Sequence, residues 1–305
     1  MDLCSITEDI LADWLFTLSA ENSARIKDAA EDPYSQSECC FDTSSCVRFI
    51  FAACERFKLP TAVKCASVAM LNRFMIIHIE GMYTYLQNAA LHPKSFSDKG
   101  QTKLEQWAGF ESRIINQIIL RCLSCIQIAS KLHSVYRPIQ VKDIRDLLLS
   151  LGHCHAPSGI LKAELRVMET LNFDYLCNNT PVVYIETLLY IITIGDPRSV
   201  FQNYLTMCMD LLEHVYLSKE RIYRRLFSIT TGKPLSENDA LRYKVVQADY
   251  ILLASAIIVA SVFCLTGQVG CTAIANRLSE VIKVPVNDMT DLATAILSEV
   301  FHSLT

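Results

Sequence analysis

The sequence predicts an all-helical protein with two domains, for three reasons. Nine glycines and nine prolines in 305 residues are fewer than average composition supplies, so the breaks that strands and turns need are scarce. The long stretches between these breaks repeat apolar residues at helical spacing. The length exceeds the ~100 to 200 residues typical of one domain, and an apolar fraction of 51% supports a large core.

The first 43 residues predict an amphipathic helix followed by a linker. Ser5 and Glu8 have the spacing of a capping box, and apolar residues follow at helical spacing as far as Leu18. From residue 21 to residue 43 the period is lost, and Ser, Asp, Glu and Pro33 gather there. We therefore treat residues 1–43 as an N-terminal helix and linker.

Residues 44–177 predict a first domain of five helices. The expected helices cover residues 46–57, 60–77, 114–132, 141–151 and 158–171. The third of these is apolar on nearly every side, which is typical of a helix surrounded by others. Residues 79–110 are less regular, because Gly81, Pro93 and Gly100 interrupt them, and we interpret this segment as an insertion.

Residues 178–305 predict a second domain of the same plan, with residues 218–247 as its insertion. The expected helices cover residues 182–194, 200–217, 250–265, 271–282 and 287–304. The central helix of each domain carries an Ala-Ser step, at Ala129-Ser130 and at Ala254-Ser255, where small side chains let neighbouring backbones come close. The shared order indicates a weak internal repeat of a five-helix unit.

Composition narrows the classes of function. A net charge of −4 gives no general attraction for nucleic acid or acidic lipid. The N-terminus carries acids where a secretory signal needs basic residues, so we expect an intracellular chain. Thirteen cysteines are an odd number spread over apolar stretches, which favours reduced, buried thiols. The most apolar run, residues 251–265, is shorter than the ~20 residues of a membrane span, so we expect a core helix and no membrane contact.

Three short motifs in this five-helix pattern resemble the cyclin family. They are Leu71-Asn72-Arg73-Phe74-Met75, Ile128-Ala129-Ser130-Lys131 and Met168-Glu169-Thr170-Leu171-Asn172-Phe173-Asp174. The resemblance is strong over residues 44–177 and rests on pattern alone over residues 180–305. It implies two tandem cyclin boxes without catalytic activity. Within the family the chain is most similar to cyclin-like proteins linked to meiotic crossover formation, which implies a nuclear, chromosome-associated location, with the cytoplasm as the alternative.

The resemblance also implies a site that binds a cyclin-dependent kinase. In kinase-binding cyclins, a lysine at the end of the third helix and a glutamate nine residues before the fifth-helix phenylalanine contact the kinase; here these are Lys131 and Glu164. Ile128, Leu161 and Leu165 of the third and fifth helices are expected to support them. Phe49 of the first helix is a further expected partner contact, because it keeps an aromatic at the site that matches the family's substrate-docking motif. Judged by residue type alone, Lys131 could instead cap a helix C-terminus and Glu164 could be a solvated charge.

Two departures from the cyclin pattern lie near the start of the first box. The stretch Asp42-Thr43-Ser44-Ser45-Cys46 aligns with the apolar substrate-docking motif and is too polar to form it, so we expect that docking function to be lost. Thr43 and Asn72 stand where the family has an arginine and an aspartate. Loss of both is tolerable, because neither charge is left buried alone.

No motif indicates catalysis or a bound metal or cofactor. Cys122 and Cys125 have Cys-x-x-Cys spacing but lie in an apolar helix without a second pair, which favours core thiols. A loop cluster, His153-Cys154-His155, has no partner cluster in the sequence. Nucleophile-elbow, P-loop and His-Glu-x-x-His motifs are absent from the sequence, so we do not expect an enzyme.

The sequence leaves three binding functions to compare. The first, which we favour, is a regulatory subunit for a cyclin-dependent kinase, with other meiotic recombination proteins as further partners. The second is a cyclin-fold scaffold that joins recombination or ubiquitin-ligase proteins without activating a kinase. The third is nucleic-acid binding through the basic segment Lys219–Lys244. We do not expect the third, because acids dilute that segment's charge.

Overall fold

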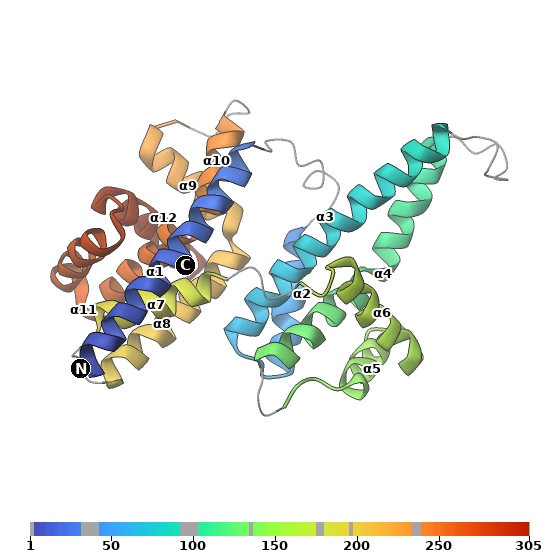
Figure 1. Cartoon of the computed structure of the whole chain (residues 1–305), viewed down its shortest axis with the longest axis horizontal. Helices are drawn as coiled ribbons and strands as arrows, with labels where there is room; N and C mark the ends of the chain where they lie inside the picture. The colour runs from blue at the N-terminus through green and yellow to red at the C-terminus, as the bar shows by residue number, and fades with distance from the viewer. Residues whose placement is uncertain are drawn as a thin grey trace. The chain divides into compact units, whose positions relative to one another are not determined.

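The computed structural model describes residues 3–31, 43–91, 103–133, 137–174, 180–194, 198–233 and 239–304. These residues form twelve α-helices and no β-strand, which confirms the predicted all-helical class (Figure 1). The chain divides into two compact units. Residues 36–178 form one, and residues 1–35 together with 179–305 form the other.

The described part of residues 36–178 consists of five helices, one of which packs against three of the others. They are α2 (Thr43–Arg56), α3 (Thr61–Leu91), α4 (Lys103–His133), α5 (Val141–Ser150) and α6 (Pro157–Thr170). The central helix, α4, packs against α2, α3 and α6, and every residue from 120 to 130 along it is buried. This burial explains why the segment is apolar on nearly every side.

In the segment interpreted as an insertion, the described residues, 79–91 and 103–110, are helical. Figure 1 shows that α3 and α4 continue side by side into this segment, where α3 ends at Leu91 and α4 begins at Lys103. Gly81 does not end α3, since a single glycine costs a helix only ~1 kcal/mol relative to alanine and the turns on either side stay helical. Pro93 and Gly100 lie outside the described ranges, and whether the segment is an insertion stays a prediction.

The described residues of the other unit form seven helices. They are α1 (Leu3–Glu31), α7 (Pro181–Ile192), α8 (Arg198–Leu217), α9 (Lys219–Thr231), α10 (Ala240–Ala248), α11 (Tyr250–Ile282) and α12 (Val286–Leu304). Gly267 interrupts α11 with φ 76° and ψ −166°, a conformation that essentially only glycine adopts. The first and second halves of α11 are therefore separate helical segments.

This break gives both units the same order of helices. With α11 counted as two segments, the series α7, α8, first half of α11, second half of α11, α12 parallels α2 to α6. The first half of α11 is the buried one, and its Ser261 is fully buried and accepts a hydrogen bond from Cys208 Sγ of α8 at 3.2 Å. Ser261 follows Ala260, which makes a further Ala-Ser step in this helix, and the small side chains let α8 approach.

Residues 218–247, the second segment interpreted as an insertion, contain α9 and α10. The apolar face of α9, with Ile222, Tyr223 and Leu226 buried, packs in a helix pair with α12. The Arg221 guanidinium bonds to the buried carboxylate of Glu299 at 3.0 Å. This part of the basic segment is thus built into the fold.

The N-terminal helix belongs to the same unit as the C-terminal helices. α1 runs to Glu31, ten residues beyond the predicted start of the linker, and packs against α7, α10 and α11. Its Asn22 side chain donates to Asp249 Oδ1 at 2.9 Å and accepts from the Tyr250 backbone N–H at 2.8 Å. The Arg25 guanidinium lies 3.8 Å from the centre of the Tyr250 ring. These contacts explain why residues 21–31 are helical despite their weak apolar period.

Two helical segments, Thr61–Tyr85 and Tyr250–Ile282, are long and apolar enough to cross a membrane by length and composition. In each, 61% of the most apolar window is buried inside the protein. A core helix surrounded by neighbours has the same composition. We interpret both as core helices, as the sequence predicted for residues 251–265.

Candidate partner-binding site

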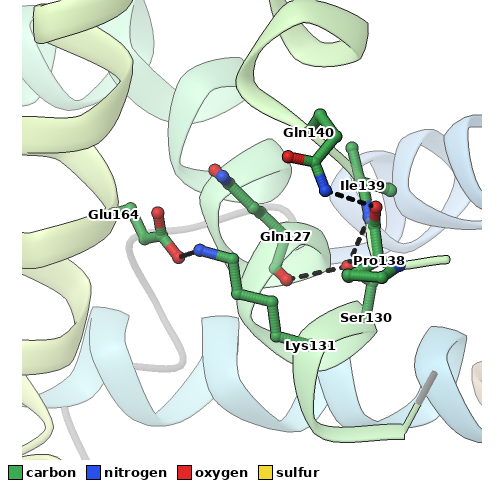
Figure 2. A network of polar contacts seen from close by, with 7 residues as sticks. All are labelled: Gln127, Ser130, Lys131, Pro138, Ile139, Gln140 and Glu164. Atoms are coloured by element: carbon green, nitrogen blue, oxygen red, sulfur yellow. Dashed lines mark hydrogen bonds and ion pairs between the residues drawn. The ribbon is translucent and has the colours of Figure 1, made fainter. Parts of the chain in front are cut away.

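Lys131 and Glu164 meet in an ion pair between the last turn of α4 and the middle of α6 (Figure 2). The two side chains differ in exposure: that of Glu164 is 5% exposed and that of Lys131 is 46% exposed. The fold therefore brings together two residues 33 positions apart. Whether they touch a kinase remains a prediction.

Because they differ in exposure, the ammonium of Lys131 and the carboxylate of Glu164 have different roles. A buried carboxylate is costly unless it is paired, and Lys131 provides the pairing. An ammonium group has three donors, so the half-exposed Lys131 can hold Glu164 and still donate outward. Lys131 is the group that can reach a partner, and Glu164 positions it.

A polar network fixes the last turn of α4, which contains Lys131. Ser130 Oγ donates to the Gln127 carbonyl oxygen at 2.8 Å and accepts from the Ile139 backbone N–H at 3.1 Å (Figure 2). This ties α4 to the segment that leads into α5. At the start of α5, Gln140 and Asp143 form a capping box, which satisfies backbone N–H groups at the first turn of that helix.

The buried face of α6 places Glu164 against α4. Ile160, Ala163 and Val167 pack inward on this face. The Arg121 guanidinium of α4 donates to the Ala163 carbonyl oxygen at 3.1 Å and links the two helices directly. Glu164 shares the face with these residues, so its carboxylate is held at the contact between α6 and α4.

Exposed leucines accompany the ion pair on α6. Leu161 is 50% exposed and Leu165 is 44% exposed, and their four-residue spacing puts them on one face of the helix. Leu132, the neighbour of Lys131, and Phe173, after the end of α6, are 37% and 56% exposed. Large exposed apolar side chains grouped near a fixed cation are typical of a protein-binding surface.

The other two predicted partner contacts lie differently. Ile128 is only 3% exposed and belongs to the core under α4, because it faces the neighbouring helices. Its side chain lies beneath the surface that carries Lys131, and its role in binding a partner stays a prediction. Phe49 is half-buried on α2. In the aligned docking stretch, Ser44 and Ser45 are exposed and Cys46 is buried, while residue 42 lies outside the described ranges.

One pair that supports the site was not singled out from the sequence. Arg73 of α3 donates to the backbone carbonyl of Asp174 and bonds its carboxylate at 2.9 Å. Arg73 and Asp174 belong to the first and third cyclin-like motifs. Both members of the pair were thus present in the motifs. The pair joins the middle of α3 to the turn after α6, where Asn172 and Phe173 have positive φ.

The cysteine and histidine pairs noted in the sequence do not form a site in the described residues. Cys125 is buried, and burial raises the pKa of its thiol to about 12. A hydrogen bond with Cys46, together with burial, raises the pKa of Cys122. The His153 and His155 rings lie 6.5 Å apart, and nowhere in the described ranges do three or more His, Cys, Asp or Glu side chains gather as metal ligands.

No protein-family model matches the sequence. It is 30% identical over 260 residues to the mouse (Mus musculus) protein named cyclin N-terminal domain-containing protein 1, covering 85% of this chain and 74% of the mouse protein. The human (Homo sapiens) protein of that name is 27% identical over 295 residues, covering 96% and 85%. A viral cyclin from herpesvirus saimiri superimposes with a TM-score of 0.50 at 14% identity, covering 85% of this chain and 83% of that one.

The fold that the chain shares with the viral cyclin, together with its three motifs, defines a cyclin-like protein. More particularly, the chain belongs to the cyclin N-terminal domain-containing protein 1 family. The predicted resemblance to cyclins is confirmed.

Proposed function

We propose that this chain is a non-catalytic regulatory subunit that binds a cyclin-dependent kinase and promotes crossover formation in meiotic recombination. A nuclear, chromosome-associated location and further contacts with recombination proteins belong to the same proposal. Its family and cyclin fold support a regulatory role through protein binding.

The observation that carries the proposal is the ammonium group of Lys131, held by a buried carboxylate beside exposed leucines. The fixed ammonium can donate to backbone carbonyls of a kinase, while Leu161 and Leu165 bury their side chains against an apolar helix face. Full burial of a leucine contributes about 1.5–3 kcal/mol. A central cation within an apolar surface also gives orientation, because its donors need acceptors once water is excluded.

The test is capture of purified cyclin-dependent kinases by the wild-type chain and by the Lys131→Ala and Glu164→Ala variants. The matched controls are Lys27→Ala and Glu31→Ala, which break an exposed ion pair, 71% and 66% exposed, in the other unit. Circular dichroism checks that each variant is folded. We expect capture by the wild type and the controls, and its loss in both folded site variants.

Failure of every kinase to bind, or capture indifferent to both site variants, would overturn the kinase-binding proposal. The scaffold function would then be the leading alternative. It predicts that a partner is held by residues 79–110 or 218–247 and that no kinase activity accompanies the complex.

A further inference from the structure

A cavity of about 310 Å³ lies between α3, α4 and α6, within the unit of residues 36–178. Neither Lys131 nor Glu164 lines it. Part of its wall is apolar, including Phe74 and Ile118. The rest carries basic side chains and no acidic one among the lining residues; the basic ones are His78, Arg113, Arg121 and Arg166.

In the described part of the chain, the guanidinium of Arg121 contacts neutral groups and no carboxylate. This residue is 8% exposed. Its guanidinium donates to the Ala163 carbonyl at 3.1 Å and to Gln117 Oε1 at 3.0 Å, and it lies 5.6 Å from the centre of the Phe74 ring. Because an arginine in a protein stays protonated, this buried charge remains, and buried charges are normally paired.

Arg166 adds a second positive charge to the same cavity. It is exposed on α6 and forms no ion pair with an acidic side chain in the described ranges. Burial lowers the pKa of Arg121, and the charge of Arg166 lowers it further. Burial, Arg166 and Arg121, in that order, lower the pKa of His78. The cavity therefore holds a positive potential that an anion would relieve.

We propose that this cavity binds the phosphorylated side chain of a partner protein, with Arg121 and Arg166 holding the phosphoryl group and the apolar wall holding the residues beside it. Guanidinium groups match phosphoryl oxygens in geometry and charge. A phosphoryl group carries about −1.5 to −2 charges at neutral pH, and two guanidiniums balance that charge better than they balance a single carboxylate.

The apolar wall favours a phosphorylated side chain over a free anion. Inorganic phosphate would use the guanidiniums and leave the partly exposed side chains of Met82, Ile114 and Ile118 facing water. A volume of about 310 Å³ is at the lower end of the range of ~300–1,000 Å³ for sites that enclose organic groups. A phosphorylated residue with an apolar neighbour uses both parts of the wall.

The test is capture of the full chain by two immobilised degenerate peptide libraries, one with a fixed phosphoserine or phosphothreonine and the other its unphosphorylated copy. We expect the phosphorylated library to capture at least ~10-fold more, since a hydrogen bond between charged groups is strong enough for that difference. The Arg166→Gln variant should lose capture by a similar factor, because Arg166 is exposed and its loss leaves the core intact.

Two control variants show whether capture depends on this cavity. Arg145→Gln removes an exposed arginine from α5 of the same unit and should retain capture. Lys131→Ala, the variant of the kinase-binding proposal, should also retain it, so the two proposals can fail independently. Equal capture of both libraries, equal capture of a library with glutamate at the fixed position, or capture unaffected by Arg166→Gln would overturn the proposal. Stronger retention by a single-stranded oligonucleotide than by the phosphorylated library would also contradict it.

Discussion

At the scale of single residues, the ion pair of Lys131 and Glu164 is asymmetric. Loss of the lysine leaves a carboxylate that is 5% exposed without its partner, whereas loss of the glutamate leaves an ammonium that is 46% exposed and can turn to water. An unpaired buried charge is the more costly of the two. The fold therefore depends on Lys131 more than on Glu164, although Lys131 lies nearer the surface.

A double-mutant cycle tests this asymmetry. Lys131→Ala should destabilise the fold more than Glu164→Ala, and the second change should cost little once the first is present. We expect a coupling energy of about 1–2 kcal/mol, reduced by the exposure of the ammonium. Urea unfolding of the four proteins measures it. The exposed pair Lys27–Glu31 should show less than ~0.5 kcal/mol in the same cycle. Additive effects at Lys131 and Glu164 would contradict the pairing, and a larger loss of stability in Glu164→Ala than in Lys131→Ala would contradict the asymmetry.

A second prediction at this scale concerns the reactivity of the buried cysteines. Burial raises the pKa of Cys125 to about 12, whereas a thiol in an unfolded chain ionises near ~8.5. At pH 8 the native Cys125 should therefore resist alkylation, while the exposed Cys154 reacts; mass spectrometry after brief iodoacetamide treatment distinguishes them. Because the folded thiol holds its proton more tightly, its contribution to stability is complete below pH ~8.5 and declines from there towards pH 12. Equal labelling rates would refute this assignment.

At the scale of helices, two glycines with similar sequence contexts have opposite structural roles. Gly81 lies inside α3 with helical geometry, and a Cβ added there meets nothing within 4 Å. Gly267 has positive φ and divides α11. Apolar periodicity does not distinguish these cases, because both glycines interrupt long apolar stretches.

Substitution by alanine should therefore act in opposite directions. Gly81→Ala should stabilise the protein by about 0.5–1 kcal/mol, because alanine loses less backbone entropy in a helix. Gly267→Ala should destabilise it by about 1–3 kcal/mol, because the φ and ψ at this position strain any residue with a Cβ. Thermal unfolding of the two variants compares them directly. A stabilised Gly267→Ala protein would mean that α11 is continuous.

The helices themselves were largely predictable. The ranges 182–194 and 287–304 fall within two residues of α7 and α12 at each end, because a strong apolar period and Pro181 are local signals. The helical extensions over residues 79–91 and 21–31 were not, since long-range packing, such as the bonds of Asn22 to residues 249 and 250, supplies what local pattern lacks.

At the scale of the whole molecule, the site was only half predictable. The cyclin motifs pointed to Lys131 and Glu164, but their pairing, and the link of Arg73 to Asp174, join positions far apart in the chain. The placement of α1 with residues 179–305 is of the same kind. Sequence pattern indicates which face a helix buries, and it does not indicate which distant segment covers that face.

That placement predicts how the two units respond to a change in α1. Asn22, 4% exposed, bonds to the side chain of Asp249 and to the backbone N–H of Tyr250 at the start of α11. Asn22→Ala should cost about 1–3 kcal/mol by leaving buried polar groups unpaired. Hydrogen exchange should show faster opening in residues 250–262 and no change in residues 120–130. Faster exchange in residues 120–130 alone would contradict the placement of α1 with residues 179–305.

Hydrogen exchange of the chain alone and in complex with a captured cyclin-dependent kinase tests the central claim most directly. The account predicts that the kinase slows exchange in residues 128–133 and 161–168, at the end of α4 and along α6, and that Lys131→Ala weakens this protection. Protection of residues 198–231 alone, or no protection in any of these segments, would contradict a kinase-binding surface built around Lys131 and Glu164.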